Sequence, residues 1–98
     1  MKQTVTMPGY MGKPWEVTGE IQAGLILHKM GPSWVLTHIG TGCLVGKSAK
    51  LQKDVKATRA ALFEVLPDWT APDMAGLAKA AGFKDAADFA RKIRDVAY

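Results

Sequence analysis

Residues 20–45 read EIQAGLILHKMGPSWVLTHIGTGCLV, and this stretch decides the fold that we expect. Residues 20–29 alternate along the chain with the period of two that is typical of a strand with one buried face. The Gly-Pro pair that follows predicts a turn. Residues 34–39, rich in β-branched and aromatic side chains, predict a second strand, and residues 43–45 predict a short third one after a Gly-containing hairpin. Residues 15–46 are therefore expected to form a three-stranded antiparallel meander.

The residues before this meander predict little regular structure. Residues 1–14 contain two prolines and two glycines, which interrupt any long element. We expect this segment to be a mobile arm. A short strand at residues 3–7 is the alternative.

The residues after the meander change to helical spacing. Residues 48–66 carry four apolar side chains at helical spacing, and Pro67 ends this expected helix. Residues 70–97 predict a helical hairpin, in which Pro72 starts the first helix and Gly82 ends it. Asp85 is expected to cap the final helix, which continues to about residue 97.

We therefore expect one domain over residues 1–98 in the α+β class, with the three-stranded antiparallel meander followed by three helices packed on one face. Among the tryptophans, Trp34 is expected in the core, while Trp15 and Trp69 are expected to lie over its margin as lids. The side chains expected to form the core are Trp34, Leu25, Leu27, Leu36, Leu51, Val55, Leu62, Leu66, Leu77, Phe83, Phe89 and Ile93.

The composition is that of an ordinary globular protein. The chain has 98 residues, of which 48% are apolar and 22% are charged. The single cysteine, Cys43, excludes an internal disulfide and is compatible with a reducing compartment. The sequence shows neither a secretory signal nor an apolar stretch long enough for a membrane helix. We expect a cytoplasmic protein without a membrane partner.

The net charge of +4 comes from one short region. Between residues 47 and 59 five cations face only Asp54, and the rest of the chain is close to neutral. A solvated helix face is the ordinary explanation of such a stripe, and a contact surface for phosphate or carboxylate groups is the functional one. On the second explanation, the predicted partner-binding residues are Lys47, Lys50, Lys53, Lys56 and Arg59.

The residues lack the spacing that each of three kinds of functional site requires, namely a phosphate-binding loop, a metal site and a catalytic pair. Residues 40–48 read GTGCLVGKS, in which both early glycines are one residue out of register for a phosphate-binding loop. His28, His38 and Cys43 lack further ligands at a fixed spacing, so we expect no metal and no cofactor. The histidines are expected to be hydrogen-bonded on the solvent-facing side of the sheet. Since no pair of titratable groups has a catalytic spacing, we do not expect an enzyme.

Residues 77–94 have the outline of a helix, a glycine turn and a second helix. This run resembles the second helix-turn-helix of arabinose-regulator-type transcription activators. The resemblance implies that Gly82 forms the turn and that residues 85–91 begin a recognition helix. The packing residues it implies are Leu77, Ala78, Phe83, Phe89 and Ile93. We expect instead a plain helical hairpin that closes over the sheet, with a DNA-reading hairpin as the alternative.

Residues 20–66 resemble short bacteriophage and prophage proteins that carry a Trp-x-x-Thr-His-x-x-Thr-Gly hairpin, here at residues 34–42, before a helix. This resemblance implies a small non-catalytic phage or mobile-element protein that binds a host protein or nucleoprotein complex and inhibits or modulates it. Anti-CRISPR proteins are one class of this kind. A small DNA-binding transcriptional regulator that uses the C-terminal hairpin, with nucleic acid as its partner, is the alternative.

Overall fold

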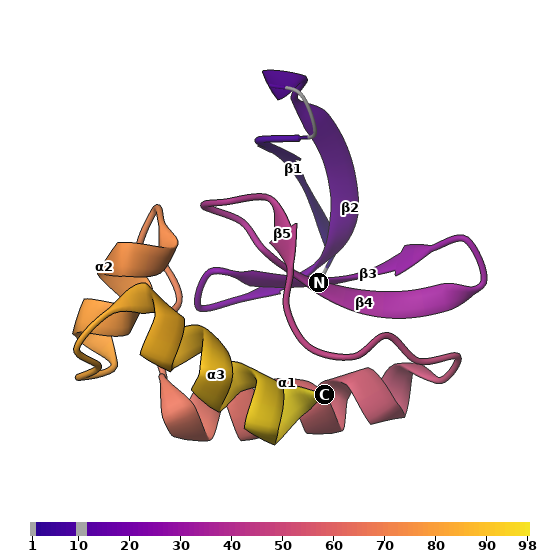
Figure 1. Cartoon of the computed structure of the whole chain (residues 1–98). Helices are drawn as coiled ribbons and strands as arrows, with labels where there is room; N and C mark the ends of the chain where they lie inside the picture. Colours follow the sequence, from indigo (N-terminus) through magenta and orange to yellow (C-terminus); the bar gives the residue numbers. More distant parts are fainter. Residues whose placement is uncertain (1, 10–11) are drawn as a thin grey trace.

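The computed structural model describes residues 2–9 and 12–98, and within these ranges the chain forms a five-stranded antiparallel sheet and three helices (Figure 1). The strands are β1 (Lys2–Met7), β2 (Trp15–Gln22), β3 (Leu25–Met30), β4 (Ser33–His38) and β5 (Cys43–Leu44). The helices are α1 (Gln52–Val65), α2 (Met74–Ala80) and α3 (Ala86–Ala97). Each strand pairs with its neighbour in sequence, in the order β1-β2-β3-β4-β5. The predicted α+β class and antiparallel meander are confirmed.

The prediction of three strands is wrong, because the described residues contain five. The mobile arm expected at residues 1–14 is wrong for residues 2–7, and the alternative of a short strand there is confirmed. These residues form β1, which pairs with the first six residues of β2. The single strand predicted over residues 20–29 is a hairpin, with β2 on one side of its turn and β3 on the other. The predicted arm also covers residues 10 and 11, which lie outside the described residues.

The turn between β2 and β3 consists of Ala23 and Gly24, whose φ angles are 49° and 92°. Two successive positive φ values are the geometry of a tight hairpin turn that matches the twist of its strands. Such a turn normally carries Asn or Gly at its first position, and Ala23 is unusual there. Trp69 N–H donates to Ala23 O at 2.7 Å, so the turn is held from outside by the segment that joins α1 to α2.

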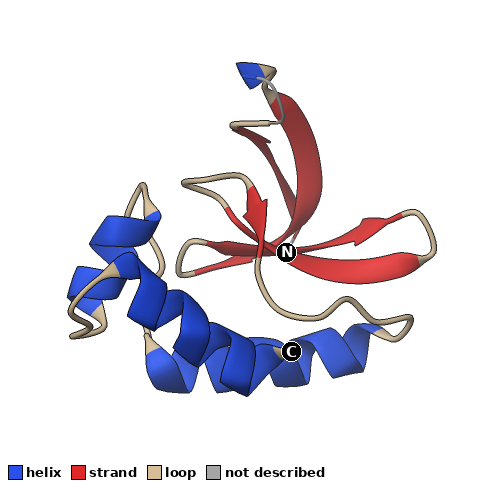
Figure 2. Ribbon diagram, in the orientation of Figure 1, coloured by secondary structure: helices blue, strands red, loops and turns tan. Residues whose placement is uncertain are grey.

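The sheet buries apolar side chains on both faces (Figure 2). On one face Leu25, Leu27 and Leu36 pack against α1, α2 and α3, which lie together on that side as predicted. On the other face β1 and β2 stand away from β3 and β4 and enclose a smaller core around Met7, Val17 and Ile26. The apolar residues of β1 and β2 are therefore buried in a core of their own, on the face of the sheet opposite the helices.

The helix ends follow local rules. Asp73 Oδ1 accepts from Gly76 N–H at 2.7 Å, and Asp85 Oδ1 accepts from Asp88 N–H at 2.9 Å, so both helices of the hairpin are capped by aspartate. Gly82 has a φ of 82° just after α2, which is the left-handed conformation predicted for it. The predicted start of α2 at Pro72 is wrong, because the helix begins at Met74 and Asp73 is its cap.

Several predicted core positions are wrong. Leu51 is 54% exposed, because α1 begins at Gln52 and Leu51 itself has extended backbone angles. Trp34 is only half-buried, while Trp69, predicted to be a lid, is 1% exposed and belongs to the main core. Phe83 is half-buried against Phe89. The other predicted core residues are buried, as expected.

Candidate binding site

The residues predicted to bind a partner lie on α1 and on the segment that leads into it. Lys53 and Lys56 are exposed on α1, and Lys47 and Lys50 are exposed on the connection from β5. The connection is fixed to the end of α3, because Lys47 N–H donates to Ala97 O at 2.9 Å. These four lysines form what we call the basic face, and their ammonium groups are free to meet an anionic surface.

Arg59 has a different role from the one predicted. Its Nη1 lies 3.0 Å from Glu20 Oε1, and its side chain is 12% exposed, so the pair joins α1 to the end of β2. The hydrogen bond and charge of Arg59 hold the pKa of the Glu20 carboxyl below its ordinary value of 4.5. Arg59 therefore positions the basic face on the sheet and has little surface left to offer a partner.

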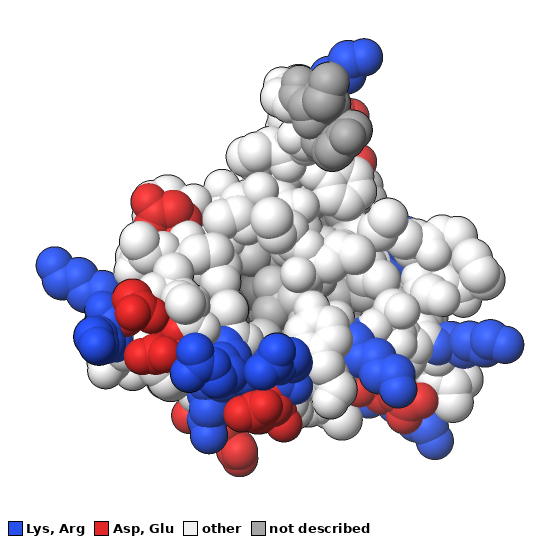
Figure 3. Space-filling model, viewed as in Figure 1, with Lys and Arg blue, Asp and Glu red and all other residues white. Residues whose placement is uncertain are grey.

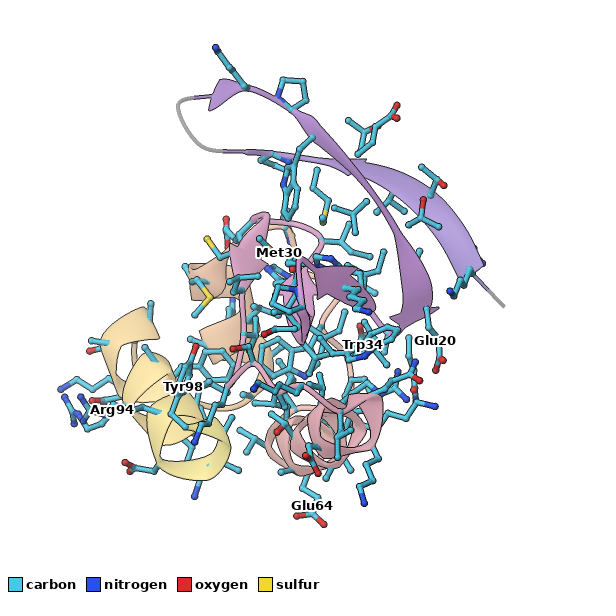
Figure 4. The ribbon with its side chains drawn as sticks, turned by 90° about the vertical axis from the view of Figure 1, so that its right-hand side faces the viewer. Glu20, Met30, Trp34, Glu64, Arg94 and Tyr98 are labelled. Carbon is cyan, nitrogen blue, oxygen red and sulfur yellow. The ribbon has the colours of Figure 1, made fainter. Side chains whose placement is uncertain are left out.

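A hollow of about 520 Å³ adjoins α1 at its first residue, Gln52, and none of the four lysines of the basic face lines it. Figure 4 shows Glu20 and Trp34 next to each other above α1, at the border of this hollow. Lys29 Nζ lies 6.0 Å from the centre of the Trp34 ring, within the range of a cation–π contact. The hollow thus combines cations with a half-buried aromatic ring. Its lining residues are Lys2, Thr18, Gly19, Glu20, Leu27, His28, Lys29, Trp34 and Gln52.

Lys2 and Lys29 belong to the site but were absent from the sequence prediction. The signal for Lys29 was present, since a tight turn at residues 31–32 places Lys29 directly opposite Trp34 in the hairpin. The pairing of β1 with β2 brings Lys2 opposite Glu20. No local pattern predicts that contact, because β1 was not expected to join the sheet.

Both histidines are hydrogen-bonded, as predicted, but neither lies on a solvent-facing surface. His28 is 2% exposed and its Nε2 lies 2.7 Å from Thr37 Oγ1. His38 is fully buried, with Nδ1 2.9 Å from Thr41 Oγ1. The sheet buries both of its faces, so no wet side exists at these positions.

His38 connects the sheet to the segment between α1 and α2. Its Nε2 lies 3.0 Å from Trp69 O and 2.8 Å from Ala71 O. Two carbonyl acceptors require that Nε2 carries the proton, so we assign Nδ1 as the acceptor from the Thr41 hydroxyl. The imidazole is thereby saturated with structural hydrogen bonds. Within residues 2–9 and 12–98, the structure contains no group of three or more His, Cys, Asp or Glu residues placed to hold a metal ion.

Because His28 is buried, we expect the protein to lose stability in mild acid. Burial lowers the pKa of His28 below its ordinary value of 6.5, and a backbone hydrogen bond at Lys29 opposes this in part. The unfolded chain therefore takes up this proton first, so the free energy of unfolding should fall as the pH drops through 6.5 toward the lower pKa of the folded state. Urea unfolding at pH 7.5, 6.5 and 5.5 gives the free energy of unfolding at each pH, and therefore its slope against pH.

The matched control for this prediction is His28→Gln, which keeps a hydrogen-bonding group near Thr37 and removes the titration. The slope of stability against pH should be smaller in this variant. An unchanged slope would mean that other groups produce the acid sensitivity.

The stretch that resembles a phosphate-binding loop has another structure. Gly40 and Gly42 lie in the turn between β4 and β5, and Gly46-Lys47-Ser48 lies in the connection that precedes α1. The α1 helix begins only at Gln52, so its first turn is not adjacent to Lys47. The predicted Gly-containing hairpin before residues 43–45 is confirmed.

The C-terminal hairpin has acidic groups where a recognition helix would meet DNA. Asp85 and Asp88 lie at the start of α3, and Arg91 Nη1 is 3.2 Å from Asp88 Oδ1. Helix-turn-helix proteins contact bases with the first turns of the second helix, where negative charge repels phosphate. Phe89 and Ile93, on the other side of α3, are buried in the main core. The hairpin thus closes over the sheet.

Comparison of the chain with protein-family models, with curated proteins and with solved structures finds no match. Among the described helices, none has the length and apolar character needed to cross a membrane.

Proposed function

We propose that this chain is a non-catalytic binding protein that covers an acidic surface of a host macromolecular machine, and so inhibits or modulates it. The observation that carries the proposal is the continuity of the basic face with the hollow at Trp34. Lys53 and Lys56 on α1 lie beside Gln52, and Lys29 and Lys2 continue the positive charge across the hollow. Carboxylates on a partner's surface match this arrangement.

The aromatic ring adds what the lysines alone do not provide. An exposed ion pair contributes about 0–1 kcal/mol, so a few surface lysines steer association more than they hold a complex. Half-buried tryptophans in a pocket are the usual anchors of protein interfaces. Trp34 stands in the hollow with Lys29 beside it, and it supplies such an anchor at the edge of the basic face.

The resemblance of residues 20–66 to short phage and prophage proteins supports a host machine as the partner, with anti-CRISPR proteins as the most concrete example. The mechanism would be occlusion by a preformed surface. The salt bridge between Arg59 and Glu20 joins α1 to the sheet, so the backbone of the surface is in place before binding and only its side chains need to be ordered. The alternative of a DNA-binding regulator has less support. Asp85 and Asp88 lie at the start of α3, the would-be recognition helix, where their charge would repel DNA phosphates.

Charge reversal of the basic face tests the proposal. The double variant Lys53→Glu/Lys56→Glu should lose its partner in a pull-down from nuclease-treated bacterial lysate, while its melting temperature stays close to that of the native protein, since exposed helix substitutions change stability by about 0.5 kcal/mol or less. Raising the salt from about 50 to 300 mM should release the native protein's partner, because exposed charges are screened over this range.

The matched control is Lys79→Glu/Lys92→Glu, which makes the same change in net charge on α2 and α3, where both lysines are exposed. This variant should keep the partner. Equal loss from both double variants would attribute binding to overall charge and contradict a specific site. Capture that disappears with nuclease would identify nucleic acid as the partner and favour the alternative.

A further inference from the structure

We infer that the edge of the sheet at β5 binds an extended apolar peptide segment of another protein as an added strand. This surface is separate from the basic face. Among the described residues, the exposed large apolar side chains are Met30 (43%), Leu44 (49%), Leu51 (54%) and Tyr98 (65%). All except Leu51 line two hollows that adjoin β5. Figure 3 shows that this face carries almost no charge, and that the charged side chains gather along its lower rim.

The two hollows meet at Leu44, which lines both. The smaller one, of about 290 Å³, lies between β5 and the C-terminal helices, with Trp69, Ile93 and Tyr98 in its wall. The larger one, of about 550 Å³, lies on the side of Trp15 and Met30. An exposed apolar area with such concave parts is typical of a binding surface in a monomeric protein.

The hollows lie on opposite faces of the sheet. Leu44 pairs with Thr37, which in turn pairs with Ile26 of the smaller core, so Leu44 points to the face of the larger hollow. Cys43 and Val45 point the other way, and Val45 belongs to the core beneath the helices. Because successive side chains of a strand alternate between faces, a strand laid beside β5 would place one side chain in each hollow.

The backbone of β5 offers the hydrogen bonds that such a strand needs. β5 is the last strand in the sheet order, so one of its edges has no neighbouring strand among the described residues. Val45 N–H donates to Leu36 O at 2.9 Å, and in an antiparallel ladder the residue before it then turns its N–H and C=O outward. The polar groups of Leu44 therefore face the proposed occupant, as in other proteins that bind peptides by strand addition.

The occupant that fits this surface is a peptide with two consecutive apolar residues and acidic flanks. Lys13 lines the larger hollow, and Arg94 is exposed beside Tyr98 (Figure 4), so one cation lies near each hollow for an acidic flank to meet. A second copy of the chain fits less well. Its own β5 has two residues, and two concave surfaces facing each other would leave both hollows unfilled.

A labelled eight-residue peptide with capped ends, a central Val-Leu pair and acidic residues on either side is the probe for this surface. We expect the full chain to bind it with a Kd of about 10–100 µM in a fluorescence-anisotropy titration, as for a small transient interface. N-methylation of the central leucine, which removes the backbone donor and keeps the side chain, should weaken binding about tenfold, the factor that corresponds to one lost hydrogen bond.

The protein variants are Leu44→Asp and its matched control Leu51→Asp, which introduces the same charge at an exposed leucine outside the hollows. Leu44→Asp should weaken binding at least about tenfold, and Leu51→Asp less than about twofold, since only Leu44 is buried by the peptide. If Leu44→Asp lowers the melting temperature, Met30→Asp takes its place, since that side chain is 43% exposed and lines the larger hollow.

Three results would overturn the inference. One is a titration that does not saturate at about 1 mM peptide, because the Kd would then be far weaker than the expected 10–100 µM. Another is equal weakening by Leu44→Asp and Leu51→Asp, which would show that only charge is involved. The third is a dimer in sedimentation experiments that Leu44→Asp dissociates, because this would assign the groove to a second copy. All three are independent of the basic face and of its partner.

Discussion

Trp69→Ala is expected to lower the free energy of unfolding by about 3–5 kcal/mol, the range for removing a large aromatic side chain from a core. Trp69 is 1% exposed, and its ring centre lies 5.5 Å from that of Phe89 and 6.4 Å from that of His38. The total free energy of unfolding of a natural domain is about 5–15 kcal/mol, so this variant should be close to unfolding at 37 °C. Urea or thermal unfolding followed by circular dichroism measures the effect.

Trp69→Phe is the informative partner of this variant. Of the buried side-chain nitrogen and oxygen atoms in the described residues, the Trp69 indole Nε1 is the one without a hydrogen-bond partner. An unsatisfied buried donor costs about 1–3 kcal/mol, so phenylalanine loses ring volume but also removes this cost. We expect Trp69→Phe to be destabilised by less than half as much as Trp69→Ala. Equal losses would show that the indole N–H has a partner, such as a bound water.

Gly24→Ala is expected to destabilise the fold by about 3 kcal/mol or more, because two separate costs add at this position. The φ of Gly24 is 92°, which is unfavourable for any residue with a Cβ. An added Cβ would also lie 2.2 Å from Trp69 O, so the segment between α1 and α2 would have to move. That movement would break the hydrogen bond from Trp69 N–H to Ala23 O.

Gly31→Ala separates the two costs. Gly31 has a φ of 59°, and an added Cβ there would meet no atom within 4 Å. Only the backbone penalty of about 1–2 kcal/mol then applies. A loss for Gly24→Ala that is no larger than for Gly31→Ala would mean that the contact with Trp69 is dispensable. The comparison needs only melting curves of two single variants.

The sequence predicted the elements that depend on neighbouring residues. Gly82 and Asp85 act within a few residues of themselves, so the end of α2 and the start of α3 were predicted correctly. The turn at Ala23 and Gly24 was missed for a specific reason. The residues before and after the turn continue one alternating pattern in the sequence, so β2 and β3 together look like one long strand. In the structure the turn pairs Ile21 with Ile26, so odd-numbered residues change face there. Alanine in place of asparagine also removed the usual turn signal.

The remaining differences come from contacts between distant residues. Arg59 and Glu20 are 39 residues apart, and no local pattern distinguishes this arginine from the lysines before it. Trp69 lies between two helices in sequence, where a lid and a core residue look alike until the segment is placed against His38. The basic face was predicted because charge can be counted, whereas the apolar hollows at β5 depend on how three separate segments meet.

The sequential strand order also determines how the chain is expected to fold. Every strand pairing is a hairpin between neighbours, so the sheet can form through short loops, which favours folding in milliseconds rather than seconds. The contacts of Trp69 with Ala23 and of His38 with Ala71 span more than thirty residues each and close far larger loops. Variants of the hairpins should therefore slow refolding, whereas Trp69 variants should mainly accelerate unfolding. The two limbs of a chevron plot would then report on different halves of one small molecule.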